Sequence, residues 1–381
     1  LHFNCRSGVR AVTEKEYARI PSERKLPPMG ADAPQEGFGL TPDIQEWKPD
    51  PAKYHWIRIE SRVCREKIRS DELKKVAFLF PGQGSQYVGM GREFYEHFRV
   101  AREVFEEADE SLGFSISNLC FHGPEEALRL TENTQPAILT VSIAALKVLK
   151  EETEIEPQFV AGHSLGEYSA LVASGTLSFR DAVKIVKLRG KFMQEAVPVG
   201  EGAMAAILGM EKEEVEELCK EAAGEEVLTP ANFNSPGQIV ISGHTPAVQR
   251  AIEMAKKKGK KAILLPVSAP FHSPLMKPAA LRLDEALKEI SVNGLNIPVV
   301  TNVEARPNLH PEKVKPLLIA QISSPVQWEQ SMRYMIAEGV EEMVEIGPGK
   351  VLSGLMKRID SSIPLRNIED LESLKKITGR G

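Results

Sequence analysis

A serine between two glycines, in the stretch Gly-His-Ser-Leu-Gly-Glu-Tyr at residues 162–168, constrains this chain more than any other feature. An apolar run precedes it at residues 158–161, and a helix-like run follows it at 168–173. Gly-x-Ser-x-Gly between a strand and a helix predicts a nucleophile elbow, a sharp turn that exposes the serine hydroxyl. The helix start supplies free N–H groups where an oxyanion would form. The motif therefore favours a nucleophilic Ser164 over a chance glycine-rich turn.

Composition and charge argue against several classes of function. The chain of 381 residues has a formal net charge of −5, so no overall basic field favours nucleic acid as a partner. No apolar run reaches the roughly 18 residues that a membrane helix needs. The four cysteines are far apart in the sequence, which speaks against a metal site or a disulfide framework. We expect a reducing compartment, with the cytoplasm as the default location.

The sequence divides into an N-terminal extension and a globular part. Residues 1–73 mix prolines with charges of both signs and have little periodicity, which predicts a linker or extended arm. From residue 74 the pattern becomes globular, beginning with a buried strand at 76–80 that ends in a glycine loop at 81–86. Further elements are expected as helices at 92–110, 136–150, 167–174, 179–196 and 326–337 and strands at 298–301 and 343–346.

Residues 201–268 have an order of their own. We expect strands at 202–209, 227–234, 238–242 and 261–267, with helices at 212–223 and 246–258. This βαββαβ order is the split-βαβ pattern. The predicted fold is α/β: a large α/β-hydrolase-like domain with a parallel-sheet core and the nucleophile elbow, over 74–200 and 269–381, and a small inserted ferredoxin-like domain over 201–268.

A nucleophilic serine needs a base. His163 is adjacent to Ser164, but neighbours on a sharp turn usually point apart, so a packing or turn role is favoured for it. His272 lies in a loop bounded by prolines after a strand, where functional side chains tend to be displayed, and is the better candidate. Arg189 could hold a carboxylate with two parallel hydrogen bonds, or it could be a salt-bridged helix residue.

Seven collinear motifs settle the choice among these candidates. They lie at residues 80–86, 162–168, 189–194, 232–238, at His272, at Gln321 followed by 324–328, and at 345–352. In this order and spacing the sequence resembles the malonyl-CoA:acyl carrier protein transacylases, a family that includes the acyltransferases of polyketide synthases. The resemblance covers about residues 74–365, nearly the whole globular part.

The resemblance implies catalytic roles. Ser164 would take the acyl group from coenzyme A as an ester, and His272 would act as its base and then as the acid for the leaving thiol. A backbone carbonyl, matching Gln321, would orient the imidazole where a triad uses Asp. The backbone N–H groups of Gln83 and Leu165 would form the oxyanion hole.

The resemblance also implies substrate contacts. Arg189 would grip the free carboxylate of a malonyl group, and Phe271 would narrow the pocket against methylmalonyl, although a core aromatic is an equal alternative for Phe271. Asn232 and Asn234 would line the cleft and support the histidine, or else cap a turn.

The implied reaction transfers malonyl from malonyl-CoA to the phosphopantetheine thiol of an acyl carrier protein, for fatty acid or polyketide biosynthesis. No metal or redox cofactor is implied, because coenzyme A is part of the substrate and phosphopantetheine belongs to the partner. Residues 1–73 could contact other synthase domains. The alternatives are an acyl hydrolase that clears stalled acyl groups, a class that tends to lack the arginine, and a non-catalytic synthase scaffold.

Overall fold

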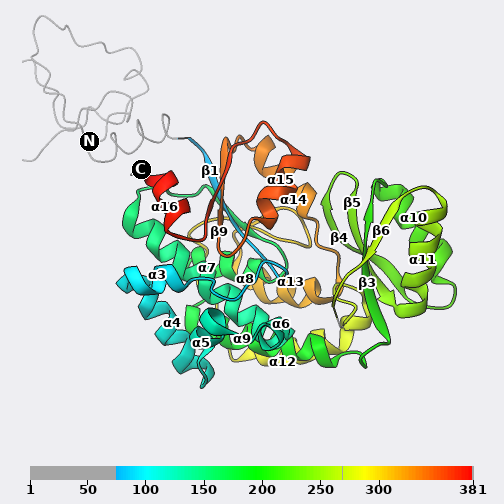
Figure 1. Ribbon diagram of the computed structural model, residues 1–381, viewed down its shortest axis with the longest axis horizontal. Helices are drawn as coiled ribbons and strands as arrows, with labels where there is room; N and C mark the ends of the chain where they lie inside the picture. Colours follow the sequence, from blue (N-terminus) through cyan, green and yellow to red (C-terminus); the bar gives the residue numbers. More distant parts are fainter. Residues whose placement is uncertain (1–73, 268, 380–381) are drawn as a thin grey trace, which may run out of the picture. The chain divides into compact units, whose positions relative to one another are not determined.

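The computed structural model describes residues 74–267 and 269–379, so the predicted extension 1–73 lies outside the described residues. The described part is an α/β structure built on two separate sheets (Figure 1). None of the helices in this described part combines the length and the apolar character that a bilayer crossing requires.

The main sheet has six strands in the order β10-β9-β1-β2-β7-β8. The central strand β1 runs parallel to β2 and β9, while β10 is parallel to β9 and β7 is parallel to β2. Strand β8 runs antiparallel to β7, which makes the sheet mixed. The strands are β1 Val76–Phe80, β2 Phe159–Gly162, β7 Val299–Val300, β8 Pro307–Asn308, β9 Glu342–Ile346 and β10 Leu365–Ile368.

Alternation along β1 assigns its side chains to two cores, because successive side chains of a strand point to opposite faces. Phe78 and Phe80 pack into the larger core, with helices that include α4 (Arg99–Leu112), α7 (Thr131–Glu152) and α9 (Phe179–Glu195). Ala77 and Leu79 pack on the other face, against α14 (Trp328–Ala337) and α15 (Val351–Ile359). Both faces of the sheet are therefore covered, which explains why β1 is apolar throughout.

The remaining helices complete these layers. They are α3 Arg92–His97, α5 Ile116–His122, α6 Glu125–Arg129, α8 Gly166–Ala173, the 3₁₀ helix η3 Pro274–Met276, α12 Lys277–Lys288, α13 Pro311–Ser323 and α16 Leu371–Thr378.

Two helices differ from their predicted bounds for local reasons. The single helix expected at 92–110 is broken at Phe98, whose extended backbone (φ −122°, ψ 126°) separates α3 from α4. Helix α7 begins at Thr131 rather than at Pro136, because the Leu130 carbonyl already accepts from the N–H groups of Asn133 and Thr134.

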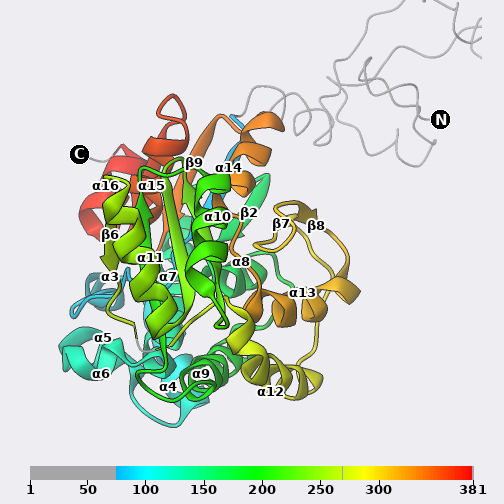
Figure 2. The ribbon, with the colours of Figure 1, turned by 90° about the vertical axis from the view of Figure 1, so that its right-hand side faces the viewer.

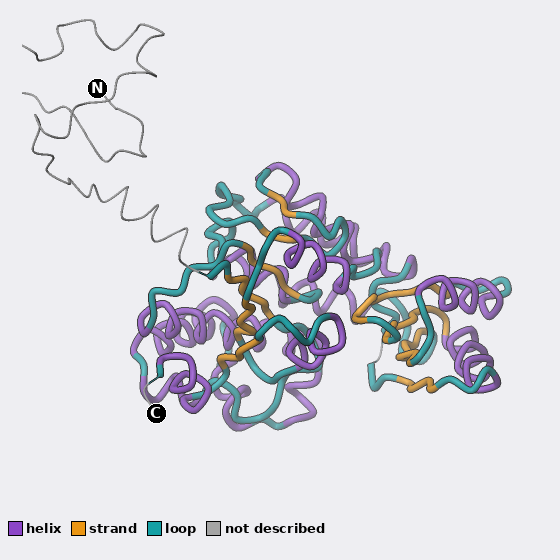
Figure 3. The backbone as a smooth tube through the Cα atoms, turned by 90° about the horizontal axis from the view of Figure 1, so that it is seen from above, coloured by secondary structure: helices purple, strands orange, loops and turns teal. Residues whose placement is uncertain are grey.

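The second sheet has four antiparallel strands in the order β4-β5-β3-β6. They are β3 Gly202–Leu208, β4 Leu228–Ser235, β5 Gln238–His244 and β6 Lys261–Leu264, and they alternate with α10 Lys212–Ala223 and α11 Thr245–Lys257. Figure 2 looks onto this sheet with its two helices in front, and Figure 3 shows the two groups of strands apart. The sheet and its helices share a separate hydrophobic core.

The segment after β6 departs from its expected course. The strand expected to reach residue 267 ends at Leu264, and the Leu265 N–H then donates to the Met204 carbonyl at 2.9 Å. Leu265 and Val267 line a cavity together with residues of both sheets' parts of the fold, among them Met204 and Ser164. Strand β4 is also joined to the main part of the fold, since the Phe233 N–H donates to the Val326 carbonyl at 2.9 Å.

Candidate active site

The turn between β2 and α8 holds Ser164 in a left-handed backbone conformation, with φ of 50°. The two flanking glycines are required by close packing. A Cβ on Gly162 would lie 1.9 Å from the Gly166 carbonyl carbon, and a Cβ on Gly166 would lie 2.1 Å from the Phe80 oxygen. Such approaches are impossible for any other residue, so the strand and helix can meet at this angle only with glycine at both positions.

Ser164 and His272 are hydrogen bonded although they are far apart in the sequence. Ser164 Oγ lies 2.7 Å from His272 Nε2, and His272 Nδ1 lies 2.8 Å from the backbone oxygen of Gln321. Because a carbonyl oxygen can only accept, Nδ1 carries the ring proton and Nε2 is left as the acceptor. The Ser164 hydroxyl therefore donates to an imidazole that is ready to take its proton.

The surroundings of His272 keep its imidazole neutral. Burial lowers its pKa, the positive charge of Arg189 lowers it further, and the resulting value is about 3. The side chain is only 4% exposed. At neutral pH the ring is therefore unprotonated, which is the state that a general base requires.

Arg189 lies on α9 and is buried, 1% exposed. Its Nη2 donates to Ser164 Oγ at 3.1 Å and to Gln321 Oε1 at 2.9 Å, and its Nη1 donates to Gln135 Oε1 at 2.8 Å. Within the described ranges no ion pair involves Arg189, and its Nε has no hydrogen-bond partner. The alternative of a salt-bridged helix residue is therefore wrong, and a buried guanidinium without a carboxylate partner can receive one.

A glycine loop runs along the elbow. Gly82 lies so close that a Cβ there would be 2.3 Å from the His163 backbone oxygen. This approach brings the next residue, Gln83, to the same cavity as Ser164 and Leu165. In the part of the chain that the structure describes, the backbone N–H groups of Gln83 and Leu165 have no hydrogen-bond acceptor. Both are available to an oxygen beside the serine.

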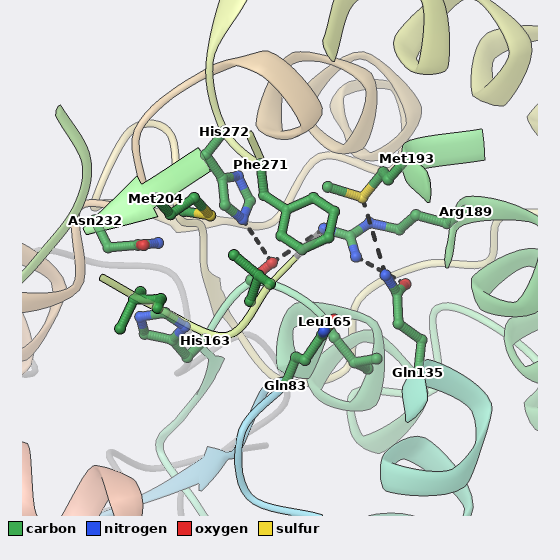
Figure 4. A pocket seen from close by; sticks show the side chains of 13 residues that line it. Gln83, Gln135, His163, Leu165, Arg189, Met193, Met204, Asn232, Phe271 and His272 are labelled. Atoms are coloured by element: carbon green, nitrogen blue, oxygen red, sulfur yellow. Dashed lines mark hydrogen bonds between the residues drawn. The ribbon is translucent and has the colours of Figure 1, made fainter. Parts of the chain in front are cut away.

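These groups meet in a cavity of about 120 Å³. His272 and Arg189 both hydrogen-bond to Ser164 Oγ, and Figure 4 shows these two side chains at the same cavity. Seven of the predicted site residues line the cavity, namely Gln83, Ser164, Leu165, Arg189, Asn232, Phe271 and His272. Gln321 lies behind it, fully buried, and contacts its walls through hydrogen bonds.

Asn234 differs from its predicted surroundings, whereas His163 has the packing role predicted for it. Asn234 does not line the cavity, and its Oδ1 is bound to His163 Nε2 at 2.8 Å rather than to His272. His163 itself lines the cavity and packs its ring against Trp328, with ring centroids 5.4 Å apart. It does not contact the serine hydroxyl, as expected for neighbours on a sharp turn.

Several further residues of the site are not predicted by the sequence motifs. Gln135, Met193, Met204, Leu265 and Val267 also line the cavity, and of these only Met193 lies within one of the seven motifs, where no role is predicted for it. Asn302 and Glu167 lie under the elbow, where Asn302 Oδ1 accepts from the Ser164 N–H at 2.7 Å. One signal could have found Asn302, because it follows β7 and polar groups at the carboxyl ends of parallel strands often reach an active site.

Metal-ligating side chains do not cluster in the described residues, where no group of three or more His, Cys, Asp or Glu could hold an ion. The polar groups of the cavity are instead one hydroxyl, the imidazoles of His163 and His272, one guanidinium and several amides. This set suits the transfer of an acyl group that carries a negative charge.

Comparisons with known proteins point to one family. The model of the acyl transferase domain family matches residues 77–375. The malonyl CoA-acyl carrier protein transacylase of Bacillus subtilis is 52% identical over 305 residues, which are 80% of this chain and 96% of that protein. The enzyme of the same name from Escherichia coli K12 is 49% identical over 288 residues, 75% of this chain and 93% of that protein.

Solved structures agree with the sequence relatives. An acyl carrier protein S-malonyltransferase from Vibrio cholerae superposes with a TM-score of 0.78 at 47% identity, covering 80% of this chain and 99% of the other. A malonyl-transacylase solved in complex with a type II polyketide synthase acyl carrier protein gives a TM-score of 0.78 at 42% identity, covering 81% of this chain and 100% of that one.

Proposed function

The chain belongs to the acyl transferase domain family, and on this premise we propose that it transfers malonyl from malonyl-CoA to the phosphopantetheine thiol of an acyl carrier protein. The single observation that carries the choice of substrate is the position of Arg189. Its guanidinium lies 3.1 Å from the serine hydroxyl oxygen and has amide and hydroxyl partners only. An acyl group on Ser164 that ends in a carboxylate would meet it directly.

In the first half-reaction, Ser164 Oγ attacks the thioester carbonyl carbon while its proton moves to His272 Nε2. The carbonyl oxygen becomes an oxyanion, which accepts from the backbone N–H groups of Gln83 and Leu165. Collapse of this intermediate breaks the carbon–sulfur bond, and His272 returns the proton to the coenzyme A thiolate. The products are free coenzyme A and a malonyl ester on Ser164.

In the second half-reaction, His272 takes the proton of the carrier protein's thiol, and the thiolate attacks the ester. The same two N–H groups hold the second oxyanion, and the proton passes from His272 to Ser164 Oγ as the ester bond breaks. Throughout, the Gln321 carbonyl holds Nδ1–H, so the ring keeps the tautomer that both proton transfers need.

Neither half-reaction calls for a metal or a redox cofactor, because coenzyme A is part of the donor and phosphopantetheine is part of the acceptor. We also propose a cytoplasmic location, where both would be at hand. A role of residues 1–73 in contacts with other synthase domains stays a prediction outside the described residues.

We also propose a division of the fold into two domains. A large α/β-hydrolase-like domain over 74–200 and 269–381 would carry the nucleophile, and a ferredoxin-like domain over 201–268 would be inserted in it. The strand order β4-β5-β3-β6, with antiparallel neighbours and two helices in βαββαβ order, supports the second assignment. The turn from β2 into α8 at Ser164 supports the first.

Mass spectrometry of the intact protein tests the function. After mixing with malonyl-CoA, the wild-type chain should gain one malonyl mass, and Ser164→Ala should gain none. Adding an acyl carrier protein that bears phosphopantetheine should then move the mass to that protein. A malonyl-enzyme that loses its acyl group to water equally fast with and without the carrier protein would instead identify an acyl hydrolase. A wild-type chain that takes up no acyl mass would support a non-catalytic scaffold.

A further inference from the structure

The nucleophile elbow needs a support that the glycines do not provide. Ser164 is one of the few described residues other than glycine with a positive φ, and such a conformation costs about 1–3 kcal/mol. Gly162 and Gly166 permit the close approach of strand and helix, but they make no hydrogen bond to the serine amide. Some other group must hold the turn in the conformation that aims Oγ at His272.

Asn302 spans the elbow with both ends of its side chain. Its Oδ1 accepts from the Ser164 N–H at 2.7 Å, and its Nδ2 donates to the Gly162 carbonyl at 2.7 Å. Each partner has only one possible role, so the orientation of the amide is determined by the contacts. Asn302 is 1% exposed and lies two residues beyond the end of β7, which pairs with β2. The amide therefore ties the residues on either side of His163 to the neighbouring strand.

Glu167 holds the backbone of Asn302 by a hydrogen bond and is itself hydrogen bonded to Gln321. One oxygen of Glu167, Oε2, accepts from the Asn302 backbone N–H at 3.0 Å and from Gln321 Nε2 at 2.7 Å. The same Nε2 donates to the Ser164 carbonyl at 3.1 Å. Gln321 also contacts His272 and Arg189, so one buried network reaches every side chain of the proposed chemistry. Glu167 is 2% exposed and lies at its base.

We call the two hydrogen bonds from the Asn302 side chain to Ser164 and Gly162 the clasp. The clasp determines the directions of Ser164 Oγ and of the Leu165 N–H. The Ser164 N–H is satisfied by Asn302, whereas the next N–H along the chain, that of the cavity-lining Leu165, has no acceptor among the described residues. If these hydrogen bonds were lost, the half-buried Ser164 N–H would have no protein partner, and relaxation of φ would move Oγ and the Leu165 N–H together. A displacement of 1 Å at a reacting group can reduce a rate about 100-fold.

We propose that Asn302, whose backbone N–H donates to Glu167, is the positioning residue of the nucleophile elbow. It holds Ser164 Oγ and the Leu165 N–H in their reactive directions. The proposal rests on the proposed function for the role of Ser164 as nucleophile. It predicts that the rate of acyl-serine formation depends on Asn302, whereas recognition of the malonyl carboxylate by Arg189 does not.

The test compares full-length Asn302→Ala and Asn302→Asp with a matched control, Asn308→Ala. Asn308 is also buried, 4% exposed, and lies in the hairpin that follows; within the described residues its side chain bonds only to the backbone of His310. The first readout is the rate of malonyl-serine formation from malonyl-CoA, by rapid quenching and mass spectrometry. The second is the rate of Ser164 labelling by a fluorophosphonate, in which an oxygen–phosphorus bond forms, fluoride leaves and His272 takes the proton.

For Asn302→Ala we expect both rates to fall about 30- to 100-fold, with the KM for malonyl-CoA and the malonyl-to-acetyl preference within about twofold of wild type. Asn302→Asp, which keeps the acceptor for the Ser164 N–H and loses the donor to Gly162, should fall between Ala and wild type. Asn308→Ala should keep wild-type rates. An Asn302→Ala protein that folds cooperatively and reacts at the wild-type rate would overturn the proposal, as would an equal loss in Asn308→Ala.

The two readouts separate this proposal from the function on which it rests. Wild-type protein that is labelled by the fluorophosphonate but not loaded by malonyl-CoA would overturn the malonyl transfer, and the labelling rates would still decide the role of Asn302. Wild-type protein that reacts with neither reagent would overturn both. If Asn302→Ala does not fold, the Asp variant decides: labelling at the wild-type rate would overturn the two-ended clasp, and a loss of threefold or more would support it.

Discussion

The two walls of the cavity are built on different principles. The wall on the side of the main sheet carries the reacting polar groups, with Ser164, Arg189 and His272 all hydrogen bonded to the buried side chain or backbone of Gln321. The wall on the small sheet consists chiefly of Met204, Leu265 and Val267, whose side chains are apolar. Electrostatic catalysis needs groups held in place before the reaction, whereas apolar contacts tolerate changes of shape. We therefore expect chemistry to depend on the first wall and selectivity on the second.

The largest effect is expected at His272. His272→Ala removes the base on the polar wall, so kcat/KM for malonyl-CoA should fall about 1,000-fold, within the usual range for loss of a general base. Steady-state transfer to a carrier protein measures it. Met204→Ala, on the apolar wall, is the matched control and should lose less than about tenfold. Comparable losses in the two variants would remove the distinction between the walls.

The second-largest effect is expected at Glu167, whose buried carboxyl group lies next to the nucleophile elbow. Burial raises the pKa of Glu167 from 4.5 to about 7, so between these values the folded protein binds a proton that the unfolded chain releases. The stabilising contribution is complete below pH 4.5 and is lost as the pH rises through 7. Glu167→Gln, which stays neutral, should therefore gain on the order of 3 kcal/mol relative to wild type between pH 4.5 and pH 8.

Denaturant unfolding at the two pH values measures this difference. His272 titrates in both proteins, so its contribution largely cancels from the comparison. The exposed Glu213→Gln on α10 is the control and should show no such pH dependence. A Glu167→Gln protein whose stability relative to wild type is the same at both pH values would contradict a raised pKa for this carboxyl group.

A smaller effect is expected at Arg189, the residue of the polar wall that we propose binds the malonyl carboxylate. Arg189→Ala should reduce malonyl transfer roughly 10- to 100-fold more than acetyl transfer, because a hydrogen bond to a charged group contributes about 1.5–3 kcal/mol. Parallel assays with malonyl-CoA and acetyl-CoA give the ratio. Lys191→Ala, on the same helix but half exposed, should leave the ratio unchanged. Equal losses for both donors would defeat the carboxylate clamp.

The smallest effect concerns the apolar side of the cavity. Phe271 lines it and is 8% exposed, so Phe271→Ser should open space for a methyl group beside the malonyl carbon. One methyl group is discriminated by about 1–3 kcal/mol, and a competition between malonyl-CoA and methylmalonyl-CoA should shift by about tenfold or more. Met204→Leu keeps its volume and should shift the ratio by less than about threefold. An unchanged ratio in Phe271→Ser would make Phe271 a core residue only.

Much of the site follows from local sequence, and the rest follows from contacts across long separations. The strand, turn and helix around Ser164 were predictable because the two glycines answer a steric demand within five residues. The proline-bounded loop of His272 favours it as the base, and the motif resemblance strengthens that assignment, whereas Arg189 is distinguished as a clamp by the resemblance alone. Asn302 escaped notice because its role depends on β7 lying beside β2. The apolar lining escaped notice because Met204, Leu265 and Val267 look like ordinary core residues.

The sequence alone determined the elements that short-range physics controls: the buried strand β1, the glycine-flanked serine turn and the βαββαβ order of the small sheet. Their periodicity and steric needs are properties of neighbouring residues. Only the tertiary structure decided which polar atoms meet, because Ser164, His272 and Gln321 come together by the pairing of strands and the packing of helices. The same packing decided that the carboxylate of Glu167 supports Asn302 and Gln321 while the charge of Arg189 stays open to a substrate.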